Sequence, residues 1–426
     1  MNIVENPRKE LWKSLSERRG WNTSSVRSLV TSILGDVKAR GDIALREYTE
    51  RFDKASPNTF RCPAANVINA SNEVTESLLK AIDQAISNIS AFHRSQIEEE
   101  RAVETMSGIR CFRQRRPIER VGVYVPGGSA PLFSTLLMLA IPARLAGVRE
   151  LVLVTPPTSE GSINPMIALC ARRLEIDEVY LMGGAQAIGA LAYGTETIRA
   201  VDKICGPGNQ FVTEAKLQVA SDGVAIDMPA GPSEVLVIAD EGARPDVVAA
   251  DLLAQSEHGA DSDVVLVALT REFVNAAHDA VVKQLETLPR ASIASQVIAR
   301  SRAIVLGSLE DAIDFSNVYA PEHLILAVAN PESYVPRVMS AGSVFLGYMA
   351  AESLGDYASG TNHVLPTGRF VTTTSGVSVD TFVKKITFQS VTAAGIASIG
   401  ETVLEMARAE GLEAHAQAVV VRQGGV

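Results

Sequence analysis

Two polar side chains near the end of a predicted helix could bind one metal ion. Pro245 is typical of a helix start and Gly259 of a helix end, which places Gln255 and His258 in the last turn. Residues three positions apart lie on one helix face, so an amide oxygen and an imidazole nitrogen can reach one point. A solvated polar helix end explains the same pattern, and the pair alone does not decide between the two.

Three further stretches place a histidine beside acidic residues, at 321–323, 355–363 and 410–415. Zinc accepts imidazole nitrogen and carboxylate oxygen, and a zinc site that also holds a substrate keeps positions open. A mixed set of four ligands is therefore conceivable, and manganese or cobalt could replace zinc in it. The set comprises Gln255, His258, Asp356 and His415.

Glu322 and His323 follow a proline, which predicts an extended or turned backbone at the start of a strand. Neighbouring strand residues point to opposite sides, so the two side chains reach one ligand only if the turn bends them. A histidine that titrates near neutrality can take a proton from an alcohol, and a glutamate can activate a water molecule. A surface ion pair is the alternative.

The elements that must position these side chains alternate between strands and helices from residue 119 onward. This alternation predicts parallel strands covered by helices, an α/β fold with two Rossmann-like, doubly wound domains. We assign 26–120 and 235–377 to a first domain and 121–234 to a second domain; the family resemblance described below implies that the first holds most zinc and catalytic residues and that the second is on the NAD side. The two successive α/β units have a similar order of strands and helices, which suggests a duplication.

The two ends of the chain are predicted to be helical. Residues 1–25 are polar with scattered apolar positions, which indicates a short helical arm. The tail, 378–426, is expected to form helices, with two in 391–422 that are separated at Gly411. Such a tail is too small for a core of its own, so it must pack on the rest of the chain or on a second subunit.

Glycine-rich turns follow three predicted strands. In open parallel sheets, ligands bind at the carboxyl ends of strands, where Tyr124, Gln186 and Asn209 could meet NAD. No turn matches Gly-x-Gly-x-x-Gly, and ordinary turn structure explains each residue alone. Ser233, where the two α/β units join, could bind a substrate or satisfy nearby backbone. The turns lie at 126–128, 183–186 and 206–209.

Composition excludes several classes of protein. A chain of 426 residues with 46% hydrophobic residues is long enough for more than one core. The net charge of −10 disfavours nucleic acid and anionic lipid as partners. Four dispersed cysteines without a Cys-x-x-Cys pair, and an N-terminus without a signal peptide, favour the cytoplasm. The uncharged stretch 121–143 is interrupted by prolines and glycines, which argues against a membrane span.

Eight blocks, in order and across nearly the whole chain, resemble the histidinol dehydrogenase family. Their number and spacing make the resemblance far more specific than any single motif. The segment 369–374 departs from it, because a more basic run is usual there. The blocks are 123–128, 183–187, 206–209, 227–234, 255–259, 320–324, 355–363 and 410–415.

The resemblance implies a zinc-dependent, cytoplasmic homodimer that oxidises L-histidinol through L-histidinal to L-histidine with NAD. It implies one zinc per subunit on the four ligands named above, with His415 reaching the partner subunit's site. His323 would be the general base, and Glu322 would activate water. Tyr124, Gln186 and Asn209 would lie near NAD. The residues implied near the substrate are Ser233, Gln255, His258, His323, Asp356, His363, Glu410 and His415.

Three alternatives remain open. A relative could oxidise another small polar alcohol with NAD and zinc, although Glu322 together with Glu410 and His415 favours a substrate with an amine and an imidazole. A zinc hydrolase could use Glu322 on metal-bound water, and a requirement for NAD would exclude it. A non-catalytic zinc or nucleotide-binding protein would not need the pair Glu322 and His323.

Overall fold

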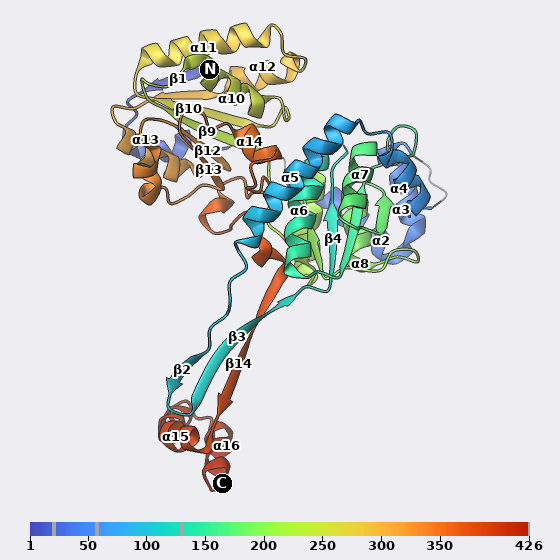
Figure 1. The fold of residues 1–426 in the computed structure, drawn as a ribbon, viewed down its shortest axis with the longest axis vertical. Coiled ribbons are helices and arrows are strands. Elements are labelled where there is room, and N and C mark those ends of the chain that lie inside the picture. The colour runs from blue at the N-terminus through green and yellow to red at the C-terminus, as the bar shows by residue number, and fades with distance from the viewer. Residues whose placement is uncertain (19–22, 56–58, 128–131, 425–426) are drawn as a thin grey trace.

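The computed structural model of the chain describes residues 1–18, 23–55, 59–127 and 132–424. Figure 1 shows two α/β lobes beside each other and a long antiparallel stalk that carries the C-terminal helices away from both. Among the described residues, every helix is too short or too polar to span a bilayer.

The first lobe contains a six-stranded parallel sheet in the order β1-β11-β10-β9-β12-β13. Its central strands are buried on both faces, as expected for parallel strands covered by helices. Helices α10 to α12 cover one face, and α1 and α13 cover the other. The strands are β1 (Asn2–Glu5), β9 (Glu234–Ala239), β10 (Asp263–Ala268), β11 (Arg302–Val305), β12 (His323–Ala327) and β13 (Ser343–Leu346). The helices are α1 (Trp12–Leu15), α10 (Pro245–Ser256), α11 (Arg271–Leu285), α12 (Ala291–Arg300) and α13 (Leu309–Tyr319).

The second lobe contains a five-stranded parallel sheet in the order β6-β5-β4-β7-β8. Numbered within each lobe from β4 or β9, both sheets contain the Rossmann-type order 3-2-1-4-5, and β1 extends the first sheet at its edge. The strands are β4 (Arg120–Tyr124), β5 (Glu150–Thr155), β6 (Glu178–Leu181), β7 (Lys203–Cys205) and β8 (Ala225–Ile226). The helices between them are α6 (Phe133–Ala146), α7 (Pro165–Arg173), α8 (Gly184–Tyr193) and α9 (Gln210–Ser221).

The assignment of residues 26–120 to the same domain as 235–377 is wrong for the helices in that segment. Helix α2 packs on α8 and α9, α4 packs on α7, and α5 packs on α6, all in the second lobe. A helical stripe such as the one through Ile82 and Ile89 identifies the buried face but not the sheet that buries it. The helices are α2 (Thr23–Arg40), α3 (Asp42–Tyr48), α4 (Ala64–Ser71) and α5 (Glu76–Arg94).

The prediction of a helical arm at 1–25 is wrong at its start. β1 pairs with β11 at the edge of the first sheet, where unpaired backbone groups bind an extended segment. A 3₁₀ turn at Lys9–Leu11 and the short helix α1 follow, and the ring of Trp12 packs edge-on against Phe315 at 5.8 Å between centroids. Residues 19–22 of the expected arm lie outside the described residues.

The C-terminal tail begins with a strand that the sequence prediction missed. β14 (Val383–Val391) pairs with β3 (Ile109–Pro117), which pairs with β2 (Val103–Met106), to form the stalk. The two expected helices then follow as α15 (Ala393–Ala409) and α16 (Glu413–Gln423), and Gly411 adopts a left-handed conformation between them. They lie at the far end of the stalk (Figure 1).

Candidate active site

The end of α10 and the short helix α14 (Glu352–Tyr357) bring potential metal ligands together in the first lobe. Ligand atoms of His258, Glu352 and Asp356 all lie within 4.8 Å of one another. Gln255 is on the last turn of α10, three residues before His258, and its side chain is buried. Three of the four predicted zinc ligands are therefore on neighbouring elements of one chain.

These residues fit a bound cation. Both polar atoms of the Gln255 amide, Oδ1 of Asp356 and Oε2 of Glu352 are buried without a hydrogen-bond partner among the described residues. Burial raises the pKa of Asp356 to about 7. It also raises the pKa of Glu352 well above its usual range, and the charges of Asp356 and Glu322 add to that effect. A nearby cation would favour the charged carboxylates and would accept the unpaired oxygens as ligands.

Glu352 is a member of this group that sequence reasoning missed. It lies four residues before Asp356 on α14, a spacing that places both carboxylates on one face of the helix. That spacing was the signal that could have identified it.

The turn before β12 brings Glu322 and His323 to this group. Both side chains are buried, which excludes a surface ion pair. Nδ1 of His323 lies 3.7 Å from Oε2 of Glu322 and 3.6 Å from Oε1 of Glu352, and its Nε2 lies 3.6 Å from Oδ1 of Asp356. The turn bends as the predicted shared site requires, because Ala320 adopts a left-handed backbone conformation.

Burial sets the protonation of this pair. It lowers the pKa of His323 to about 3, with a smaller contribution from the charge of His363. It raises the pKa of Glu322 well above its usual range, although the backbone N–H of Glu234 donates to Oε2 of Glu322 at 2.8 Å and opposes that shift. The imidazole is therefore neutral near pH 7 and can accept a proton.

His363 connects the two lobes at the same place. Its Nδ1 lies 2.7 Å from the backbone oxygen of Asp356, and its Nε2 lies 3.2 Å from Oγ1 of Thr135 on α6. Because a carbonyl oxygen only accepts, Nδ1 carries the proton and Nε2 accepts from the hydroxyl of Thr135. Burial lowers the pKa of His363 to about 4, which agrees with a neutral ring.

A small cavity joins the second lobe to the catalytic pair. Its lining includes Gly206 and Pro207 of the turn after β7, and Glu322 and His363 of the first lobe. The turn predicted to bind NAD therefore faces Glu322 and His363 across this cavity.

The three residues predicted near NAD lie in the second lobe, where Tyr124 ends β4, Gln186 is in the first turn of α8 and Asn209 directly precedes α9. The hydroxyl of Tyr124 accepts from the backbone N–H of Gly184 at 3.2 Å, and Nε2 of Gln186 donates to Oδ2 of Asp53 at 3.4 Å. Asn209 is exposed, and its side chain accepts from the first backbone N–H groups of α9, the capping role that ordinary turn structure predicts. Part of the turn after β4, 128–131, lies outside the described residues.

Two predicted residues are far from this site within one chain. Glu410 ends α15 and His415 lies in α16, and both are exposed. Figure 1 shows these helices at the end of the stalk, while α14 lies in the first lobe. Ser233 directly precedes β9, and its backbone oxygen accepts from the N–H of Asp263 at 3.0 Å.

The family model described as histidinol dehydrogenase matches residues 16–423. The chain belongs to the histidinol dehydrogenase family. A crystal structure of histidinol dehydrogenase from Elizabethkingia anophelis superposes with a TM-score of 0.97 at 52% identity, and covers 99% of this chain and 98% of that chain.

Curated members of the family agree over the same length. The histidinol dehydrogenase of Xylella fastidiosa strain Temecula1 is 52% identical over 413 residues, which are 97% of this chain and 96% of that protein. The histidinol dehydrogenase of Vibrio cholerae is 48% identical over 423 residues, 97% of each. The predicted family is confirmed, and with it an NAD-dependent, zinc-binding oxidoreductase of histidine biosynthesis.

Proposed function

We propose that this chain oxidises L-histidinol to L-histidine through L-histidinal, with zinc and two molecules of NAD. The observation that carries the proposal is the small cavity between the Gly206 turn and Glu322 and His363. Its lining includes the turn predicted to bind NAD, Glu322, which is predicted to activate water, and His363, which is predicted near the substrate. Family membership supports the substrate.

Zinc would be held in this chain by Gln255, His258 and Asp356. The unpaired buried atoms of Gln255 and Asp356 match its needs, and the exposed His258 adds an imidazole nitrogen. When bound, it would orient a substrate that carries an imidazole and an amine, and positioning of this kind accounts for large rate gains. Glu352 lies against the same group and balances the charge of the cation.

His323 takes the hydroxyl proton in the first oxidation, while the carbon-bound hydrogen leaves as hydride. Its buried, neutral ring is ready to accept that proton without first losing one. NAD supplies the hydride acceptor, and the product of this step is the aldehyde.

Glu322 activates water in the second oxidation. The backbone N–H of Glu234 donates to Oε2 of Glu322 at 2.8 Å and favours the carboxylate, the form that can remove a proton from water. Addition of that water to the aldehyde produces the hydrate, which loses a second hydride to form the acid.

The active form would be a homodimer in the cytoplasm, with Glu410 and His415 completing the site of the partner subunit. One chain cannot bring them to Asp356 without moving the stalk (Figure 1). The tail helices also expose Met406, Leu412 and Val421, apolar side chains that a second subunit could cover. The free state of all four cysteines suits a reducing compartment.

The test of the reaction is the yield of NADH from zinc-loaded protein. Two NADH per L-histidinol consumed, lost on chelation and regained with zinc, would support the proposal. No NADH from L-histidinol would refute it, and a screen of other small polar alcohols with NAD would follow.

The test of the shared site is mixing of two inactive variants, His415→Ala and Asp356→Ala. A mixed dimer would combine the intact Asp356 of one subunit with the intact His415 of the other. Random exchange of subunits would restore about a quarter of the wild-type activity, because half of the dimers would be mixed and each would hold one intact site. No recovery, despite subunit exchange shown with tagged chains, would contradict the shared site.

A further inference from the structure

A buried arginine connects the N-terminal segment to the strand and the turn that hold the catalytic pair. Nε and Nη2 of Arg18 donate to the two carboxylate oxygens of Glu234 at 3.1 and 2.8 Å. The side chains of Arg18 and Glu234 are only 13% and 2% exposed. The guanidinium carbon also lies 3.6 Å from the ring centroid of Tyr319. Paired in this bidentate way and stacked on a ring, the guanidinium has little freedom to move.

The same guanidinium holds the turn from which Glu322 emerges. It donates to the backbone oxygen of Tyr319 at 2.5 Å and to that of Ala320 at 3.1 Å. Ala320 ends α13 with φ 57°, a left-handed conformation that is unfavourable for alanine. A cation at the carboxyl end of a helix satisfies its last carbonyl groups and stabilises this turn.

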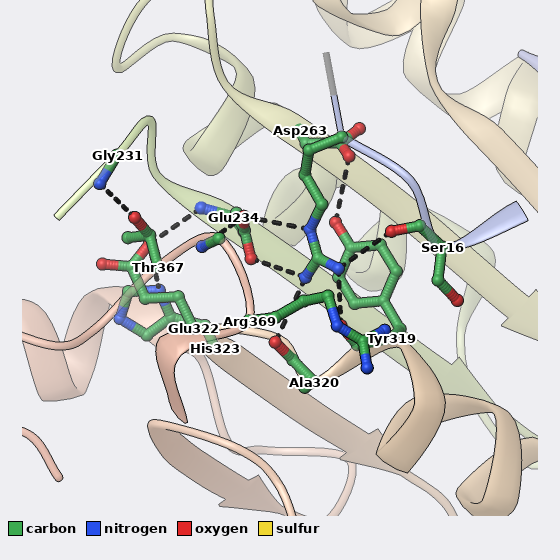
Figure 2. A network of polar contacts seen from close by, with 12 residues as sticks. Ser16, Gly231, Glu234, Asp263, Tyr319, Ala320, Glu322, His323, Thr367 and Arg369 are labelled. Atoms are coloured by element: carbon green, nitrogen blue, oxygen red, sulfur yellow. Dashed lines mark hydrogen bonds and ion pairs between the residues drawn. The ribbon is translucent and has the colours of Figure 1, made fainter. Parts of the chain in front are cut away.

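Glu234 links Arg18 to the carboxylate of Glu322 by hydrogen bonds to both residues. The backbone N–H of Glu234 donates to Oε2 of Glu322 at 2.8 Å, while its side chain accepts from Arg18 and from the N–H of Gly368 at 2.9 Å. Figure 2 shows Glu234 between Tyr319 on one side and Glu322, beside His323, on the other. Arg18 thus acts on Glu322 from two directions, through the turn and through Glu234.

His323 depends much less on this arrangement. It is the first residue of β12 and is paired in register with Val235 of β9 and Ser343 of β13. Its ring lies among Glu322, Glu352 and Asp356 and near the backbone of Glu234, which the strand pairing of β9 holds, and no contact with Arg18 occurs among the described residues. Loss of Arg18 should therefore displace the carboxylate more than the imidazole.

We propose that Arg18 is a positioning residue for the second oxidation, which holds the Glu322 carboxylate in the orientation that activates water. The inference rests on the role of Glu322 given under the proposed function. A buried ion pair is often no more stabilising than apolar side chains of the same size, so fold stability alone is a weak reason for this one. Orientation of the Glu322 carboxylate gives the ion pair of Arg18 and Glu234 a specific function.

The test compares the two half-reactions in the full-length, zinc-loaded enzyme. For Arg18→Met, we expect kcat for oxidation of supplied L-histidinal to fall at least about tenfold, because a displaced general base loses most of its contribution. The first oxidation, followed with an aldehyde trap, should stay within about twofold of wild type. Arg18→Lys should be intermediate, because an ammonium keeps the charge but not the two-pronged contact.

Arg120→Met is the matched control. The side chain of Arg120 is 5% exposed, and it pairs with Glu150 and Glu178 at the start of β4 in the second lobe, away from Glu322. It should reduce stability without changing the ratio of the two half-reactions. A purely structural role of Arg18 predicts the same behaviour for Arg18→Met.

Glu322→Gln, measured in parallel, distinguishes a failure of the role of Arg18 from a failure of the proposed role of Glu322. Selective loss of the second oxidation in both Glu322→Gln and Arg18→Met supports both. Selective loss in Glu322→Gln alone overturns the role of Arg18 and leaves the proposed function standing. Equal loss of both oxidations in Glu322→Gln overturns the role of Glu322 and the inference with it. If Arg18→Met does not fold, an unchanged ratio in Arg18→Lys overturns the inference.

Discussion

The buried pair of Lys216 and Asp227 is expected to hold the turn that faces the catalytic cavity. Nζ of Lys216 lies 2.5 Å from Oδ1 of Asp227, and the two side chains are 3% and 1% exposed. Lys216 also donates to the backbone oxygen of Gly206 at 2.7 Å, and Oδ2 of Asp227 accepts from the N–H of Gly206 at 2.7 Å. Both backbone polar groups of Gly206 are thus satisfied by the pair, and Lys216→Met removes one half of it.

The expected loss of stability follows from what remains buried. Removing one partner of a buried ion pair costs about 3–5 kcal/mol, because the other charge is left without compensation. Asp227 keeps two backbone donors, Gly206 and Met228, which favours the lower end of that range. The lost bond to Gly206 adds about 1 kcal/mol, so we expect about 3–4 kcal/mol in total. Asp227→Asn in the same chain should be less than additive by at least about 1.5 kcal/mol.

The assay combines urea unfolding with NAD kinetics, at fixed protein and zinc concentrations because both shift the apparent stability. The KM for NAD should rise about tenfold, since a displaced Gly206 turn loses about 1.4 kcal/mol or more of binding. Lys203→Met is the control, because Lys203 lies on β7 and bonds only the backbone oxygen of Thr381 among the described residues. Unchanged stability would refute the magnitude, and reduced stability with an unchanged KM would refute the connection to NAD.

Three further outcomes are expected. Asp356→Asn should weaken zinc binding by more than about tenfold in a chelator competition, because it removes a charged ligand, and unchanged affinity would exclude Asp356 from the metal site. Gly355→Ala would place a methyl group 2.6 Å from the ring of Phe345 and should shift α14. It should therefore weaken zinc binding without changing the circular dichroism spectrum. Wild-type affinity for zinc would mean that the ring of Phe345 moves instead. The pKa of His323 is lowered from 6.5 to about 3, so between these values the unfolded chain binds a proton that the folded chain does not, and stability falls as the pH falls from 6.5 toward 3. His323→Gln should reduce that slope by up to about 1.4 kcal/mol per pH unit in urea unfolding at pH 5 and 6, and identical slopes would show that the imidazole is not buried in its neutral form.

Local patterns in the sequence predicted most elements but not their partners. The alternation of strands and helices from residue 119 identified both parallel sheets, and the break at Gly411 identified the two tail helices. The helices in 26–94 were assigned to the wrong lobe because an amphipathic stripe has the same form whichever sheet covers it. β1 and β14 were missed because each is held by pairing with a distant strand.

The candidate site likewise contains residues that the sequence identified and one that only the structure revealed. Motifs named Glu322, His323, His258 and Asp356 in advance, and the structure brings these four together. Glu352 was missed because its spacing of four residues from Asp356 shows only a shared helix face, and the approach of α14 to α10 is a property of the tertiary structure. Their roles in the reaction stay predictions for the experiments above.

The sequence alone determined the family and the chemical groups that the chain can use, because residue types and their order are properties of the chain itself. The tertiary structure decided which of those groups meet, that Arg18 reaches Glu234, and that the tail stands apart from the lobes. The physical reason is the sequence separation over which each kind of interaction acts. Helix and turn propensities act over a few residues. The contact between Arg18 and Glu234 spans 216 positions and forms only when the first sheet and its helices have packed.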